Sequence, residues 1–139
     1  MKKYTLQIET EEDSLFYALL STEKITRLAW LLNAQFQFNF ERVESIEWYN
    51  ESERANYYFS KFIYNDELNH LTYTLFANYS EAKILFTELR AMQYFILVEG
   101  GLSFFSEKPF LAQLKQINEI QLTMQVDQSR LKQKPNLIL

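Results

Sequence analysis

The side chains best able to do chemistry in this sequence are the only histidine and two acidic residues that precede it. Asp66, Glu67 and His70 lie close together and could bind a cation. Metal sites, however, need three or four ligands in a fixed geometry, and one histidine is too few for any motif that uses two imidazoles. We therefore expect residues 66–70 to form an ordinary polar turn, and we assign no metal site.

Nucleophilic catalysis finds no support in the sequence. There is no cysteine, no serine stands in the G-x-S-x-G context of a nucleophile elbow, and the 2 glycines are too few for a loop that cradles phosphates. General acid–base chemistry could use a pair drawn from four glutamates, none of which the sequence singles out: Glu44, Glu47, Glu88 and Glu99. Carboxylate chemistry thus stays open as an alternative. We favour a protein that is not an enzyme and assign no catalytic residue and no cofactor.

A row of residues on a predicted helix is a candidate binding surface. Arg27, Trp30 and Asn33 follow one another at intervals of three residues, which places them along one side of a helix beside its apolar stripe. Such a row could line a binding cleft. The alternative is that Trp30 covers the edge of the core while the Arg27 guanidinium stacks on its ring.

The segment 57–64 is dense in aromatic residues. Aromatic side chains on an open sheet can stack on the bases of a nucleic acid. That mode of binding also needs clustered Lys and Arg, and the net charge of −4 argues against it, so we expect no nucleic-acid partner. We expect one face of this strand to pack in the core and the other to form a partner interface or a ligand pocket.

The composition is typical of a globular domain. A chain of 139 residues is about one domain, and an aromatic fraction of 17% can build a substantial core. The longest apolar run, residues 15–20, is too short to cross a bilayer, and the first residues lack the pattern of a signal peptide. We therefore expect a soluble cytoplasmic protein with no membrane partner.

Hydrophobic patterns in the first half of the chain predict both strands and helices. The run Leu15–Leu20 is compatible with a helix or a strand, because short apolar runs do not separate the two, and we favour a short helix. The other expected elements are a strand at Tyr4–Ile8, a longer helix from a Ser21 or Thr22 cap to residues 33–35, and strands at 38–48, 57–64 and 71–77. The longer helix has apolar residues on one face at Ile25, Leu28, Ala29 and Leu32.

The second half continues with short elements around one strongly apolar strand. The expected elements are a short strand at 83–86, a helical turn from Thr87, a central strand at 94–98, a helix capped by Ser106, a half-buried strand at 120–126 and a turn capped by Ser129. In the strand at 38–48, the alternation changes phase between Phe40 and Val43, which predicts a bulge there.

This order of elements predicts an α+β fold, in which two main helices pack on one face of a mainly antiparallel sheet. Residues 1–128 form a single predicted domain. Residues 129–139 form a C-terminal tail, and we expect its apolar end to pack against the domain.

The stretch from Phe86 to Tyr94 resembles the signature of a known family. Its sequence, FTELRAMQY, is similar to the motif of the uncharacterised bacterial IPExxxVDY family. Glu88 and Tyr94 are retained. At the other motif positions, Phe86 replaces Ile, Thr87 replaces Pro, Met92 replaces Val and Gln93 replaces Asp.

Two further segments extend this resemblance over most of the chain. Lys24–Asn33 is similar to the family's N-terminal helix, and Asn136–Ile138 is similar to its ending. The family has no assigned activity, so the resemblance implies a common fold and little more. Gln93 removes the carboxylate that would pair with Glu88, so any acid–base chemistry in the family would be lost here.

Two functions are compatible with these observations. The first is a non-enzymatic interaction domain that self-associates, with a homodimer as the expected assembly, because aromatic residues are enriched in interface cores. The second is a module that binds a small molecule or peptide of unknown identity in a cleft between the first long helix and the Glu88 turn. The residues proposed for that cleft are Arg27, Trp30, Asn33, Glu88 and Tyr94. We also expect Glu88 to tie its turn by accepting backbone hydrogen bonds.

Overall fold

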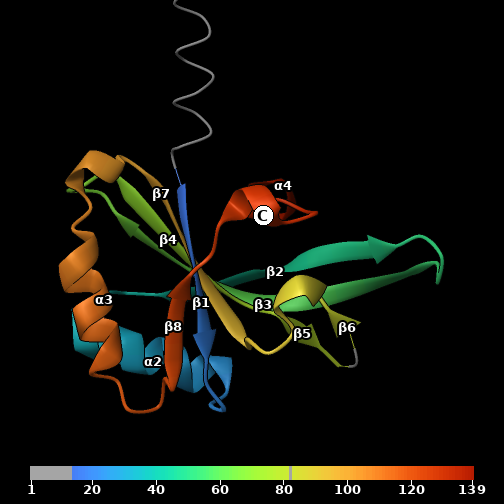
Figure 1. Cartoon of the computed structure of the whole chain (residues 1–139), viewed down its shortest axis with the longest axis horizontal. Helices are drawn as coiled ribbons and strands as arrows, with labels where there is room; N and C mark the ends of the chain where they lie inside the picture. Colours follow the sequence, from blue (N-terminus) through green and yellow to red (C-terminus); the bar gives the residue numbers. More distant parts are fainter. Residues whose placement is uncertain (1–13, 82) are drawn as a thin grey trace, which may run out of the picture.

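Six strands pair antiparallel in the order β2-β3-β4-β7-β1-β8 (Figure 1). The structure is a computed structural model that describes residues 14–81 and 83–139. The strands are β1 (Ser14–Leu20), β2 (Glu41–Asn50), β3 (Ala55–Asp66), β4 (Leu71–Ala77), β7 (Tyr94–Gly100) and β8 (Leu122–Gln125). As predicted, β7 lies inside the sheet, where its apolar residues are buried on both faces.

The remaining elements are short strands and helices that cover the sheet. They are α2 (Ile25–Phe36), the pair β5 (Tyr79–Ser80) and β6 (Lys83–Ile84), the 3₁₀ turns η1 (Thr87–Leu89), η2 (Leu102–Phe104) and η3 (Gln128–Arg130), and the helices α3 (Glu107–Lys115) and α4 (Pro135–Ile138).

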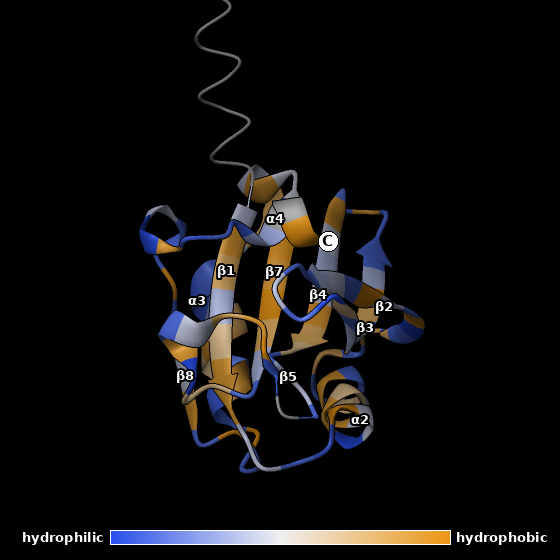
Figure 2. Cartoon of the chain, turned by 90° about the vertical axis from the view of Figure 1, so that its right-hand side faces the viewer, coloured by the Kyte–Doolittle hydropathy of each residue, from blue (hydrophilic) through white to orange (hydrophobic). Residues whose placement is uncertain are grey.

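Helices α2 and α3 pack on the same face of the sheet, which confirms the predicted α+β architecture (Figure 1). Every buried residue of the two helices belongs to one cluster with strand residues such as Tyr17, Leu75 and Ile96. This face of the sheet we call the helical face. The central strands β4 and β7 are among the most hydrophobic parts of the chain (Figure 2).

The opposite face of the sheet is closed by chain segments rather than by long helices. Its centre is a group of four stacked or tilted phenylalanine rings with centroids 4.9–6.4 Å apart, from Phe16, Phe76, Phe86 and Phe95. Residues 85–92 supply Leu85, Phe86 and Met92 to this cluster. The C-terminal segment adds Val126 and Leu131, and the last two residues pack against it.

The prediction of a helix at Leu15–Leu20 is wrong, because this segment is strand β1. β1 lies between β7 and β8 and is buried on both faces, so its apolar residues do not alternate. Neither Ser21 nor Thr22 caps α2, which begins after Lys24 without a side-chain cap. Instead, the buried Ser21 hydroxyl donates to the carbonyl of Glu119 at 2.7 Å.

The predicted strands at 38–48 and 120–126 differ from the structure in detail. β2 begins only at Glu41, and its irregularity lies between Val43 and Ile46. β8 is shorter than predicted, and Leu122 and Met124 are 49% and 39% exposed because β8 ends the sheet.

Three smaller predictions concern caps and the first strand. Ser106 takes the N-cap position of α3 but makes no capping hydrogen bond. Asp127, not Ser129, caps η3, since its carboxylate accepts from the Ser129 N–H at 3.1 Å. The strand predicted at Tyr4–Ile8 lies outside the described residues.

Gly100 is where the end of β7 meets the turn between β3 and β4. Its φ of +108° is a conformation that L side chains rarely adopt. A Cβ at Gly100 would lie 2.4 Å from the carbonyl oxygen of His70, a backbone atom that cannot move aside alone. The next residue, Gly101, donates its N–H to the same carbonyl at 2.8 Å.

We expect Gly100→Ala to lower the free energy of unfolding by about 2–4 kcal/mol, because it adds both backbone strain and overlap with His70. Gly101→Ala is the matched control. A Cβ there would meet the flexible Phe104 side chain at 3.1 Å, so we expect a loss below about 1 kcal/mol. Equal losses in urea unfolding of the two variants would contradict the structure at this turn.

Candidate functional site

Arg27 and Trp30 form a stacked pair on the solvent side of α2. The Arg27 guanidinium carbon lies 5.0 Å from the centre of the Trp30 ring, and Arg27 also pairs with Glu119 at 3.8 Å. Trp30 is largely exposed. The stacking is the arrangement that the alternative interpretation of this row predicted.

Asn33 holds the connection between α2 and β2. Its side chain accepts the N–H of Phe40 at 2.8 Å and donates to the carbonyl of Phe40 at 3.3 Å. Both polar ends of this carboxamide are therefore used within the chain.

Tyr94 joins the start of β7 to the loop before α2. Its hydroxyl donates to the carbonyl oxygen of Glu23 at 2.5 Å. Burial raises the pKa of Tyr94, so the phenol stays neutral at physiological pH and keeps this hydrogen bond.

Glu88 lies in η1 and reaches the C-terminal segment. Its carboxylate accepts the backbone N–H of Lys132 at 2.9 Å, and this bond lowers the pKa of the carboxyl group. The expected backbone hydrogen bond is therefore present, but it links the turn to a residue 44 positions away.

The five predicted residues do not gather at one site. Tyr94 packs against the cluster of the helical face, to which α2 also belongs. Glu88 is bonded to Lys132, next to Leu131 in the cluster of the opposite face. The sheet thus lies between Glu88 and the Arg27–Trp30 pair.

A buried asparagine that sequence analysis did not single out fixes the segment carrying Glu88. Asn78 follows β4 and is fully buried. Its Oδ1 accepts the N–H of Phe86 at 2.7 Å, and its Nδ2 donates to the carbonyls of Leu89 and Met92 at 3.1 and 2.9 Å. One side chain thus satisfies backbone groups across the whole of residues 86–92.

The backbone of Asn78 contributes to the same arrangement. Its N–H donates to the carbonyl of Gln93, and its carbonyl accepts the N–H of Leu85, both at 2.8 Å. We call this set of bonds between Asn78 and residues 85–93 the Asn78 lock. Asparagine is common in turns, so its place after an apolar strand gives no signal of this role.

The Gln93 side chain links the end of the 85–93 segment to Ser21, which follows β1. Its side-chain oxygen accepts the N–H of Ser21 at 2.9 Å, while its amide donates to the carbonyl of Ala91 at 3.2 Å. Gln93 therefore has a structural role in this chain.

Carboxylates do not collect into a reactive group. Across residues 14–81 and 83–139, no three His, Asp or Glu side chains are close enough to hold a metal ion. Burial raises the pKa of Glu99 on β7. Glu107 accepts a 2.5 Å hydrogen bond from Tyr17, whose pKa is raised by burial and by this carboxylate.

The two edge strands of the sheet, β2 and β8, carry different exposed side chains. β2 carries exposed charged residues at Glu41, Arg42, Glu44 and Glu47, and its pairing with β3 is irregular between Val43 and Ile46. Charges and bulges of this kind prevent pairing with a further strand. β8, with the sequence Leu-Thr-Met-Gln, has no charged residue and two half-exposed apolar side chains.

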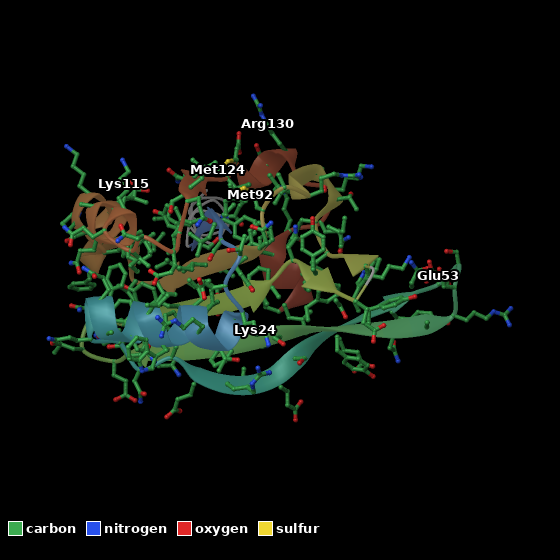
Figure 3. The ribbon with its side chains drawn as sticks, turned by 90° about the horizontal axis from the view of Figure 1, so that it is seen from below. Lys24, Glu53, Met92, Lys115, Met124 and Arg130 are labelled. Atoms are coloured by element: carbon green, nitrogen blue, oxygen red, sulfur yellow. The ribbon has the colours of Figure 1, made fainter. Side chains whose placement is uncertain are left out.

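The β2–β3 hairpin projects beyond the rest of the sheet (Figure 1), with Glu53 at its tip (Figure 3). Tyr49 and Tyr58 are exposed on it. On its other face, Lys83 forms an ion pair with Glu53 and lies over the Tyr57 ring, which attaches the hairpin to β6.

Comparison of the chain with protein-family models, with curated proteins and with solved structures finds no match. Its function must therefore be inferred from its own surfaces. Within the part of the chain that the structure describes, no helix is long and apolar enough to span a membrane.

We expect Asn78→Leu, which keeps the branched shape of the side chain but removes its polar groups, to lower the free energy of unfolding by about 3–5 kcal/mol. Each buried carbonyl or N–H left without a partner costs about 1–3 kcal/mol. Urea unfolding of Asn78→Leu against Asn56→Leu, an exposed asparagine on β3, measures this loss. A loss below about 1 kcal/mol at Asn78 would contradict the role of the lock.

Proposed function

We propose that this chain is a non-enzymatic interaction domain that self-associates by pairing β8 with β8 of a second copy. The observation that carries the proposal is the contrast between the two margins of the sheet. β2 is charged and irregular, whereas β8 is uncharged and carries exposed Leu122 and Met124. An uncharged edge strand with apolar side chains is a ready template for another strand.

A second copy fits this edge because antiparallel pairing is self-complementary. A two-fold axis at Thr123 would set Leu122 of each copy opposite Met124 of the other. Both side chains lie on the face that β8 shares with Ala18 and Leu20 of β1. Their contact across the axis would remove apolar surface from water, and the paired backbones would satisfy the outer edge of β8.

The interface would be small, since β8 is a strand of four residues. Small interfaces are typical of transient assemblies. We therefore propose an equilibrium between monomer and dimer with a dissociation constant of roughly 10–100 µM, which corresponds to about 5–7 kcal/mol.

We keep the relationship to the IPExxxVDY family as a proposal. Glu88 and Tyr94, the two retained motif residues, each hold backbone of another segment, at Lys132 and at Glu23. These two hydrogen bonds support a structural role for the motif rather than a catalytic one. A cytoplasmic location in a bacterium is part of the same proposal, and it is supported by the absence of cysteine.

We expect Met124→Lys to abolish the dimer at 100 µM protein, because it places two ammonium groups close together at the β8 pair. Sedimentation equilibrium of the full chain measures the change. We expect the free energy of unfolding to change by less than about 0.5 kcal/mol, since Met124 is partly exposed.

Leu68→Lys is the matched control, because it makes the same apolar-to-cationic change at a residue that is 87% exposed in the β3–β4 turn. It should leave the dimer intact. A monomeric parent chain at 500 µM would refute self-association. A dimer that survives Met124→Lys but is lost in Tyr58→Lys would move the interface to the β2–β3 hairpin.

A further inference from the structure

A hollow of about 220 Å³ opens on the helical face, at the end of the sheet where α2 stops and α3 starts. Its walls come from five places in the chain: the end of α2 and the residues after it, the turn between β3 and β4, the start of β4, η2 with the residues after it, and the first turns of α3. Neither β8 nor the Arg27–Trp30 pair lines it.

Five aromatic rings that line the hollow pack against one another. The neighbouring ring centroids are 4.7–6.2 Å apart in the order Phe36, Phe38, Tyr73, Phe105, Phe110 and back to Phe36. A sixth ring, that of the exposed Phe104, stands at the rim. Aromatic faces carry a negative electrostatic potential, so an aromatic lining of this kind favours a positive charge.

Asp66 is the acidic residue in this lining. Of the described residues that line the hollow, Asp66 alone is charged. Its two oxygens accept the backbone N–H and the side-chain amide of Asn69 at 3.3 and 2.9 Å, which fixes the carboxylate at the wall. No lysine or arginine among the lining residues neutralises it.

Tyr73 supplies a polar group with no partner of its own. The residue is 5% exposed and lines the hollow, and its hydroxyl makes no hydrogen bond to any residue within 14–81 or 83–139. Burial, with Asp66 nearby, raises its pKa to about 12, so it is a neutral phenol there.

We propose that this hollow binds a small organic cation, an ammonium group carried on an apolar or aromatic body. The ring faces and the Asp66 carboxylate would hold the charge, and the Tyr73 hydroxyl would accept from or donate to a polar substituent. This site is separate from the β8 margin, so it extends the proposed function and does not depend on it.

The size of the hollow limits the ligand to about one ring with its charged group. Benzene fills an apolar cavity of roughly 150 Å³, whereas pockets for drug-sized ligands begin at roughly 300 Å³. At about 220 Å³, the hollow lies between these sizes.

Three one-ring probes of different charge test the proposal on the isotopically labelled full chain. They are benzyltrimethylammonium, benzyl alcohol and benzoate, followed by chemical-shift titration. We expect saturable binding of the cation, with shifts of the Phe105 and Phe110 amides, at an affinity about tenfold or more above that of benzyl alcohol, and no saturation with benzoate.

Substitutions of lining residues test whether the cation binds in the hollow. We expect Asp66→Asn to weaken binding of benzyltrimethylammonium about fivefold or more. Phe104→Ala should also weaken it at least threefold, and folding should tolerate this change because the ring is exposed. Glu47→Gln removes the same charge from exposed β2 and should leave the affinity unchanged.

Several outcomes would overturn the proposal. They are a titration with the cation that does not saturate, equal affinity for benzyl alcohol or benzoate, and unchanged cation affinity in Asp66→Asn. None of them bears on the dimer, which Met124→Lys tests separately.

Discussion

The hydrogen bonds of the Asn78 carboxamide determine how the chain covers the face of the sheet opposite the helices. Residues 85–92 cross that face around the short turn η1, where the carbonyls of Phe86 and Leu89 accept the N–H groups of Leu89 and Met92. The buried N–H of Phe86 and the carbonyl of Met92 take their partner from Asn78. Asn78 supplies the donors from one fixed point and accepts the N–H of Phe86 as well. With the backbone so held, the rings of Phe86 and Phe95 meet edge to face.

The C-terminal segment depends on this arrangement in turn. Once η1 is fixed, the Glu88 carboxylate stands where it can accept the N–H of Lys132. Leu131 then enters the buried cluster beside Met92. Both broad faces of the sheet are thus covered by the chain itself, and the features available to partners lie at the β8 margin and in the aromatic hollow.

Much of this fold could be predicted from local patterns. The central strand at β7, the strands β3 and β4, and the apolar stripe of α2 each follow from periodicity within one segment. β1 could not be assigned, because a short apolar run buried on both faces has no period that separates strand from helix. The exposed side of β8 was missed because alternation says nothing about a strand's place at the edge of a sheet.

The candidate sites were harder to predict because they join residues that are distant in sequence. Stacking of Arg27 on Trp30 involves neighbours on one helix and was foreseen as an alternative. The partner of Glu88 is 44 residues away, and the hollow brings Phe36, Tyr73 and Phe110 together from three elements. No spacing rule within a single segment connects such residues.

Hydrogen exchange of individual amides in the native protein measures whether the Asn78 lock holds residues 85–92 to the sheet. If the Asn78 lock makes residues 85–92 part of the cooperative core, the Phe86 amide should exchange only through global unfolding. Its opening free energy would then equal that of the Ile96 amide in β7. A Phe86 amide that exchanges a hundredfold or more faster than that of Ile96, which is about 2.7 kcal/mol, would contradict the account.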